Sequence, residues 1–175
     1  MRKILIVVDM QNDFVDGSLG SKEAIAIVDN VVNKIHSFDG EIIVTYDTHF
    51  NNYMETREGK RLPVPHCIKG TNGWELNEKV QKALNSKQYK KICKPTFGST
   101  ELVKLFHDCD QQNTEIMLIG LCTDICVVSN AMLLKAYYPE MNISVDASCC
   151  AGVTIESHQA ALLTMKMCQI DIIEE

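Results

Sequence analysis

The fold is decided by residues 116–128, which read IMLIGLCTDICVV. The four apolar residues at the start are typical of a parallel strand that is covered on both faces. Gly120 then indicates a sharp turn, and Thr123 and Asp124 are good N-cap residues for a helix that follows. Cys126 falls in the first turn of that helix, where unpaired N–H groups and the helix dipole favour a thiolate. The stretch therefore predicts a reactive cysteine, with one more buried core cysteine as the alternative.

Strands and helices alternate along the rest of the chain. Strands are predicted at residues 3–9, 41–47, 90–93, 142–146 and 169–173, and helices at 74–85, 99–107 and 155–167. A further helix is predicted to begin after Ser21 and to bury Ala24, Ile25, Val28, Val31, Val32 and Ile35. This alternation indicates an α/β fold, a doubly wound, mainly parallel six-stranded sheet with helices on both faces. We expect a single domain over residues 1–175.

Composition narrows the classes of partner. The chain is 46% hydrophobic and 23% charged, as a globular domain is, and carries a net charge of −6. That charge argues against nucleic acid and anionic membranes, which favour basic patches. No apolar run approaches the roughly 20 residues that span a bilayer. We therefore expect no nucleic-acid partner and no membrane partner.

The eight cysteines do not suggest a disulfide scaffold. They are scattered along the chain without the double pairs typical of a metal site, and we expect most of them to be reduced and buried. Only five apolar residues separate Lys3 from Asp9, which is too short for a signal peptide. The prediction is a cytoplasmic protein.

Three strand ends supply the residues for cysteine chemistry. Ligand sites of parallel sheets lie beyond the carboxyl ends of the strands, where Asp9 and Lys94 are predicted beside Cys126. A cysteine nucleophile needs a base, and burial should raise the pKa of Asp9 and suit it to that role. Lys94 could stabilise the thiolate. A loop-capping acid and a surface lysine are the alternatives, since spacing alone does not bring the three together.

Two motifs carry a resemblance to a known family. Residues 9–14, DMQNDF, and 120–127, GLCTDICV, resemble the isochorismatase-like cysteine hydrolases, and within them the nicotinamidases. The resemblance covers nearly the whole chain. It implies that Asp9, Lys94 and Cys126 are the catalytic acid, lysine and nucleophile.

The same resemblance implies the surroundings of the nucleophile. It places a cis peptide between Leu121 and Cys122, and an oxyanion hole at the amides of Cys122 and Cys126. Phe14 matches an aromatic residue that packs on the substrate ring, and Phe97 is expected to form a pocket wall. The tryptophan expected before the proline–histidine pair is missing, because residues 62–65 read LPVP. Trp74 lies too far along the chain to replace it.

A metal site is predicted beside these residues. Asp47 and His49 lie two apart at a strand end, and one carboxylate with two imidazoles suits zinc, with iron or manganese as alternatives. By resemblance, the ligands are Asp47, His49 and His66, with Glu58 or Glu55 as a further candidate. The remaining histidines, His36, His107 and His158, are expected to be exposed to solvent. Cys67, next to His66, is expected to be structural.

The resemblance implies hydrolysis of nicotinamide to nicotinate and ammonia through a thioester acyl-enzyme. Two alternatives remain: hydrolysis of another small amide or a carbamoyl or ureido compound, and a homologue that binds a ligand without catalysis. Members of the family are commonly dimers or tetramers, so we expect a homo-oligomer. Residues 48–72 are predicted to form a long irregular loop, which is typical of a functional segment.

Overall fold

The computed structural model describes residues 1–174 and contains one sheet of six parallel strands. The strands lie in the order β3-β2-β1-β4-β5-β6, which is doubly wound because the order reverses direction beside β1. In chain order they are β1 (Arg2–Val8), β2 (Glu41–Asp47), β3 (Tyr89–Lys94), β4 (Thr114–Leu121), β5 (Asn142–Ala151) and β6 (Asp171–Ile173). The predicted fold class is confirmed.

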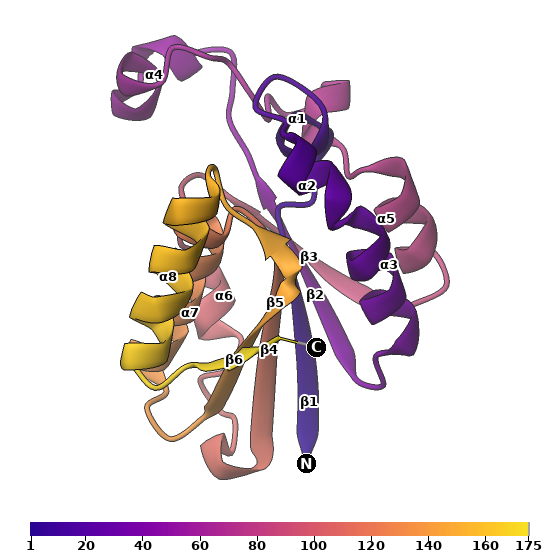
Figure 1. Cartoon of the computed structure of the whole chain (residues 1–175), viewed down its shortest axis with the longest axis vertical. Helices are drawn as coiled ribbons and strands as arrows, with labels where there is room; N and C mark the ends of the chain where they lie inside the picture. The colour runs from indigo at the N-terminus through magenta and orange to yellow at the C-terminus, as the bar shows by residue number, and fades with distance from the viewer. Residues whose placement is uncertain (175) are drawn as a thin grey trace.

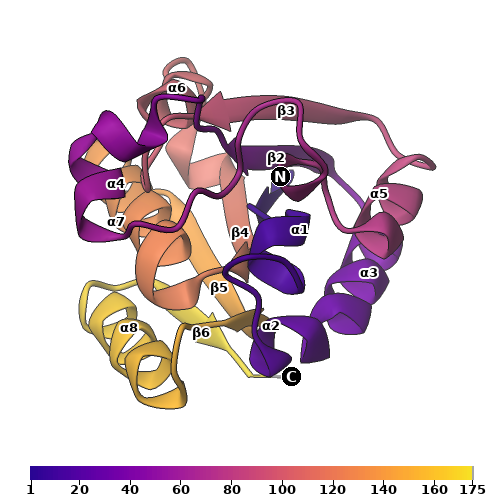
Figure 2. The ribbon, with the colours of Figure 1, turned by 90° about the horizontal axis from the view of Figure 1, so that it is seen from above.

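Helices cover both faces of the sheet, as Figures 1 and 2 show. One face carries α1 (Asn12–Val15), α2 (Lys22–Ala26), α3 (Val28–Ser37) and α5 (Glu78–Leu84), and the other carries α6 (Thr100–Lys104), α7 (Val128–Tyr137) and α8 (Ile155–Met167). The short α4 (Arg57–Arg61) stands above the carboxyl ends of the strands. Residues 48–72, expected to be irregular, therefore contain α4 and also a 3-10 turn, Tyr53–Glu55.

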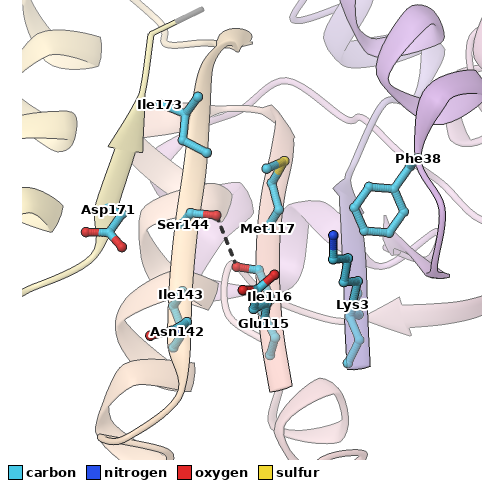
Figure 3. A pocket seen from close by; sticks show the side chains of 11 residues that line it. Lys3, Phe38, Glu115, Ile116, Met117, Asn142, Ile143, Ser144, Asp171 and Ile173 are labelled. Carbon is cyan, nitrogen blue, oxygen red and sulfur yellow. Dashed lines mark hydrogen bonds between the residues drawn. The ribbon is translucent and has the colours of Figure 1, made fainter. Parts of the chain in front are cut away.

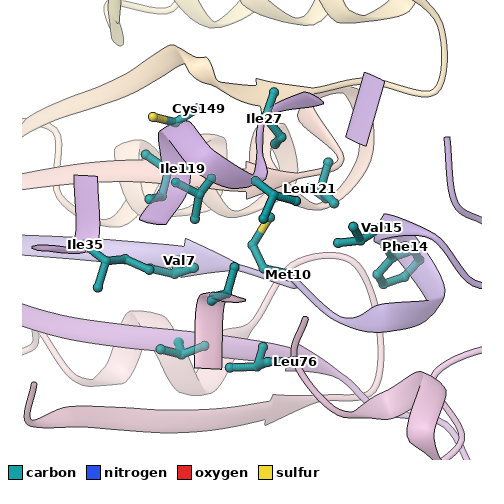
Figure 4. Packing of buried hydrophobic residues seen from close by; sticks show 14 of the residues in the cluster. Val7, Met10, Phe14, Val15, Ile27, Ile35, Leu76, Ile119, Leu121 and Cys149 are labelled. Atoms are coloured by element: carbon teal, nitrogen blue, oxygen red, sulfur yellow. The ribbon is translucent and has the colours of Figure 1, made fainter. Parts of the chain in front are cut away.

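The central strand β1 is buried on both faces. Leu5 and Val7 belong to the cluster beneath α3 and α5, part of which is shown in Figure 4, whereas Ile4 and Ile6 pack on the side of α7 and α8. Burial of each such side chain stabilises the fold by about 1.5–3 kcal/mol. The continuous apolar run of β1 follows from this double coverage.

The helix predicted after Ser21 is divided into α2 and α3. Ser21 Oγ accepts a hydrogen bond from the Ala24 N–H at 3.0 Å and caps α2, as expected. Ile27 ends α2 and precedes α3, and Ile25 is 54% exposed, contrary to the prediction. The buried stripe contains Ala24, Val28, Val31 and Ile35. At about 100° per residue, Ile25 lies to one side of that stripe.

Other predicted boundaries moved by several residues. Helix α5 begins at Glu78 and not at residue 74, because Asn77 Oδ1 caps it by accepting from the Lys79 N–H at 3.1 Å. Helix α6 ends at Lys104 and not at residue 107. Strand β5 continues to Ala151 and not only to residue 146, because its pairing with β4 shifts register and then resumes.

A hollow of about 460 Å³ lies at the amino-terminal end of the sheet (Figure 3). It crosses the first residues of β1, β4 and β5 and reaches β6, with Lys3, Met117 and Ile173 among its lining. Ligand sites of parallel sheets lie at the opposite end. The hollow is therefore separate from the predicted site. Within residues 1–174, no helix has both the length and the hydropathy that crossing a bilayer requires.

Candidate active site

Four strand ends bring the predicted site residues to one edge of the sheet. Asp9 directly follows β1, Asp47 ends β2, Lys94 ends β3, and Cys126 comes one turn after β4. Asp47 and Lys94 are partners in the register of β2 and β3. Because the strands are parallel, their carboxyl ends share this edge, and residues distant in sequence become neighbours.

The Lys94 ammonium joins Asp9 to Cys126. Its Nζ lies 2.6 Å from Asp9 Oδ2 and 3.4 Å from Cys126 Sγ, and all three side chains are buried. A buried ion pair requires further hydrogen bonds to offset the lost hydration. The Thr45 hydroxyl donates one to Asp9 Oδ1 at 2.7 Å, and Lys94 donates one to the Thr96 carbonyl at 3.1 Å. The lysine is therefore not on the surface, and the acid does not cap a loop.

Burial governs the ionisation of these groups. It raises the pKa of Asp9, against the opposing charge of Lys94, as expected. Burial also raises the pKa of the Cys126 thiol, and the Asp9 carboxylate adds to that effect. This direction is opposite to the expectation that the helix N-terminus favours a thiolate, and its main cause is the removal of the sulfur from water. A protonated thiol beside a basic carboxylate suits proton transfer at the moment of attack.

The turn that carries Cys126 begins with a cis peptide between Leu121 and Cys122, at the position that the resemblance implied. A π-helical turn, Thr123–Val127, follows and leads into α7. The Cys122 carbonyl accepts hydrogen bonds from the amides of Ile125 and Val127 at 3.1 and 3.0 Å. These bonds fix the backbone between the cis peptide and the nucleophile.

Neither predicted N-cap residue caps this turn. Thr123 Oγ1 lies 2.8 Å from His158 Nδ1, and the Asp124 carboxylate accepts from the Val153 N–H at 3.2 Å. Both interactions tie the turn to the start of α8, and these tertiary partners replace the local cap. His158 is consequently half-buried and not solvent-exposed as predicted, whereas the other two histidines expected at the surface are exposed.

A second cluster lies beside the first. The candidate ligand atoms of Asp47, His49, Glu58 and His66 all lie within 4.8 Å of one another. His49 Nε2 is 2.9 Å from Asp47 Oδ2 and 3.6 Å from Glu58 Oε1. His66 Nε2 is 3.6 Å from Asp47 Oδ2 and 3.7 Å from Glu58 Oε1. Glu58 on α4 thus joins the three predicted ligands, while Glu55 is exposed.

The chemistry of this donor set fits a divalent cation. His66 Nδ1 lies 2.8 Å from the Val64 carbonyl, to which only a protonated nitrogen can donate, so Nε2 keeps its lone pair toward the cluster. Burial alone would raise the pKa of Asp47, but the hydrogen bond with His49 and the charge of Lys94 outweigh it and lower that pKa. Two imidazoles and two carboxylates suit zinc, iron or manganese. Lys94 Nζ lies 3.4 Å from Asp47 Oδ1 and so connects this cluster to the cysteine.

A cavity of about 50 Å³ is lined by residues of both clusters. Its lining comprises Phe14, Leu19, Asp47, Glu58, Leu62, His66, Phe97, Cys122, Ile125 and Cys126. The two phenylalanines expected at the substrate are therefore at the cavity, and the Phe14 ring is 5.5 Å from the His66 ring. Trp74 does not line the cavity, and its indole N–H donates to Thr48 Oγ1 at 2.9 Å. Cys67 is fully buried in the core, as expected of a structural cysteine.

Two supporting residues were not predicted from the sequence. Thr45 holds Asp9, and its only signal was a polar residue inside an apolar strand. Gln11 is fully buried and brackets the backbone of Asp47, donating to its carbonyl at 2.8 Å and accepting from its amide at 2.7 Å. Both residues make their hydrogen bonds to the end of a neighbouring strand, and a local sequence pattern cannot predict such contacts.

Comparison with known proteins identifies the family of the chain and supports its fold. The isochorismatase domain family matches residues 3–174. The isochorismatase family protein PncA of Bacillus subtilis is 31% identical over 175 residues, and the match covers 93% of each chain. The crystal structure of nicotinamidase/pyrazinamidase PncA from Bacillus subtilis superposes with a TM-score of 0.86 at 28% identity, covering 99% of this chain and 100% of that one.

A metal-containing structure is also similar. Pyrazinamidase of Pyrococcus horikoshii in complex with zinc has a TM-score of 0.79 and 26% identity, with all of both chains covered. The family match and the superposition agree on the fold. The chain belongs to the isochorismatase domain family, and its neighbours there are nicotinamidases and pyrazinamidases.

Proposed function

We propose that the protein is a cysteine-dependent amidohydrolase that converts nicotinamide to nicotinate and ammonia through a thioester acyl-enzyme. The observation that carries this proposal is the contact of Lys94 with both Asp9 and Cys126 at a cavity that the metal cluster also lines. The similarity to nicotinamidases supports the reaction class.

The chain's own residues supply the steps. Asp9 takes the thiol proton of Cys126 as the sulfur attacks the amide carbonyl, and Lys94 stabilises the developing thiolate. The amides of Cys122, in the peptide after Leu121, and of Cys126 hold the oxyanion. Asp9 then protonates the departing ammonia. It next removes a proton from the water that cleaves the thioester and restores the free thiol.

The second cluster would orient the substrate. Asp47, His49, Glu58 and His66 would hold a divalent metal, for which zinc is our first choice. Bound there, the metal would supply Lewis acidity toward the ring nitrogen of a pyridine carboxamide. Phe14 would pack against the ring.

Another small amide, such as a carbamoyl or ureido compound, is the second candidate substrate. The cavity of about 50 Å³ and the missing ring-stacking tryptophan favour it. A non-catalytic homologue is disfavoured by the intact contacts among Asp9, Lys94 and Cys126.

We also infer a cytoplasmic homo-oligomer. All eight cysteines, which lie within the described residues, are unpaired, and this supports a reducing compartment. Exposed apolar side chains on α8, Leu163 and Met167, support an interface between subunits.

Ammonia release from nicotinamide tests the proposal. The purified protein is assayed as prepared, after chelation, and after zinc is restored, alongside Cys126→Ala and the matched control Cys168→Ala at the end of α8. We expect release that disappears in Cys126→Ala, falls on chelation and persists in the control. Undiminished turnover by Cys126→Ala would rule out the cysteine mechanism, and release from other small amides alone would identify the second candidate.

A further inference from the structure

The Asn130 side chain connects the nucleophile to the wall of the cavity. Asn130 lies in the first turn of α7 and is fully buried. Its Nδ2 donates to the Cys126 carbonyl at 2.7 Å and to the Phe97 carbonyl at 3.1 Å, and its Oδ1 accepts from the Ser99 amide at 2.9 Å. All three bonds go to backbone groups. Asn130 therefore positions the chain and does not itself touch the reacting atoms.

The wall consists of residues 95–98, PTFG, which join β3 to α6. Within the part of the chain that the structure describes, these four residues make no backbone–backbone hydrogen bond. The wall is held at its start by Lys94 through the Thr96 carbonyl at 3.1 Å, and at its end by Asn130. Side chains of the reaction centre and of the nucleophile's helix therefore hold the backbone that carries Phe97, the residue of this segment that lines the cavity.

We propose that Asn130 is a positioning residue that determines specificity, because it fixes the Phe97 wall relative to Cys126 and so limits the width of groups that can reach the sulfur. The cavity measures only about 50 Å³, so a small movement of the wall changes what can enter beside the nucleophile. The expected change in KM for nicotinamide rests on the proposed function, whereas the expected change in alkylation of Cys126 does not.

One substitution can keep the hydrogen bond to Cys126 and remove the hydrogen bonds to Phe97 and Ser99. Ser129 donates its hydroxyl to the Ile125 carbonyl four residues earlier at 2.5 Å, and the hydroxyl in Asn130→Thr can reach the Cys126 carbonyl in the same way. That shorter side chain cannot reach Phe97 or Ser99. Asn130→Thr therefore keeps the bond to the nucleophile and releases the wall, and Asn130→Ser is a second variant with the same property.

A matched control is available on the same pair of helices. The hydroxyl of Tyr138, the C-cap residue of α7, donates to the Val103 carbonyl on α6 at 2.6 Å, and Tyr138 is buried without lining the cavity. Tyr138→Phe also removes a buried hydrogen bond between these helices. It controls for a general loss of stability.

Steady-state kinetics give the first readout. For Asn130→Thr we expect KM for nicotinamide to rise about tenfold while kcat stays within about threefold, because the nucleophile keeps its bond and the wall does not. Tyr138→Phe should leave both constants within about twofold. A fall in kcat with unchanged KM would overturn the proposal.

The second readout needs no hydrolysis. Iodoacetamide and the wider iodoacetanilide both alkylate a thiolate, with a C–S bond forming as iodide leaves, and mass spectrometry of the Cys126 peptide gives the two rates. We expect the rate ratio of iodoacetanilide to iodoacetamide to rise at least about fivefold in Asn130→Thr and Asn130→Ser, and to stay unchanged in Tyr138→Phe. An unchanged ratio, an equal rise in the control, or failure of both Asn130 variants to fold would overturn the proposal. If the wild-type protein releases no ammonia from nicotinamide, the proposed function fails and this ratio still decides the role of Asn130.

Discussion

Replacing Thr45 with valine tests the role of Asp9 as the base. The Thr45 hydroxyl donates to Asp9 Oδ1 at 2.7 Å, and both side chains are fully buried. Valine has nearly the same shape and suits a strand, so Thr45→Val removes the hydrogen bond with little repacking. That bond favours the charged carboxylate. Its loss should raise the pKa of Asp9 further above its ordinary value.

The size of the effect follows from the contacts. A hydrogen bond to a charged group contributes about 1.5–3 kcal/mol, and one pKa unit corresponds to about 1.4 kcal/mol. Lys94 remains 2.6 Å from the other carboxylate oxygen, so we expect the lower end, a rise of about one unit. Because only ionised Asp9 can accept the thiol proton, the acid limb of kcat/KM should move up by about one pH unit. On that limb kcat/KM should fall about tenfold, and on the plateau it should stay within about twofold of the wild-type value.

The assay is ammonia release from nicotinamide at substrate concentrations below KM, measured as a function of pH. Thr114→Val is the control, because the Thr114 hydroxyl is also buried and donates to the Asp110 carbonyl at 2.7 Å, at the far end of the sheet. An acid limb that stays in place or moves down in folded Thr45→Val would refute the reasoning. An equal shift in the control would refute it too.

Three other changes have outcomes set by the structure. Glu58→Gln should weaken zinc binding about 10- to 100-fold in competition with a chromogenic chelator, whereas exposed Glu55→Gln should not. Asp146→Asn should lower the free energy of unfolding by about 2 kcal/mol at neutral pH, because Lys34 Nζ lies 2.7 Å from the buried carboxylate. Burial would raise the pKa of Asp146, but the pairing with Lys34 outweighs it and lowers that pKa. The difference in free energy of unfolding between the wild-type protein and Asp146→Asn should therefore be present above about pH 4 and vanish as the pH falls through the lowered pKa. Urea unfolding at several pH values measures this difference. Gly120→Ala should lower the free energy of unfolding by more than about 3 kcal/mol, because the φ of Gly120 is 114° and a Cβ would collide with the Val8 carbonyl. Gly70 has a φ of 86° but lies in open space, so Gly70→Ala should lower the free energy of unfolding by only about 1 kcal/mol. Thermal unfolding of both variants measures the two values.

The sequence predicted the parts of the site that topology alone fixes. Alternating strands and helices imply a parallel sheet, and a parallel sheet brings its strand ends together. Asp9, Asp47 and Lys94 could therefore be placed at one edge before any contact was known. The local pattern after β4 predicted Cys126 as a reactive cysteine and the family resemblance gave it the role of nucleophile, and the structure brings its sulfur within 3.4 Å of Lys94.

The missed residues depend on partners far away in sequence. Thr123 has a good N-cap side chain, yet it interacts with His158 on α8, because a tertiary partner was available. Asn130 was not singled out from the sequence, although it holds a loop more than thirty positions earlier. The thiol of Cys126 was misjudged because a sequence records its nearness to a helix start and not its burial.

The link that Lys94 makes between the two clusters also determines the electrostatic balance of the site. Asp9 and Asp47 contact this single ammonium, and Glu58 lies in the second cluster beside Asp47, so three carboxylates and one ammonium carry a formal charge of −2. A divalent ion cancels that excess, and so would two protons. A metal ion and protons therefore compete for these carboxylates, and removal of the metal at neutral pH should be accompanied by uptake of protons from the buffer. Burial raises the pKa of Glu58 and of Asp9, so these two carboxylates are the ones suited to accept them.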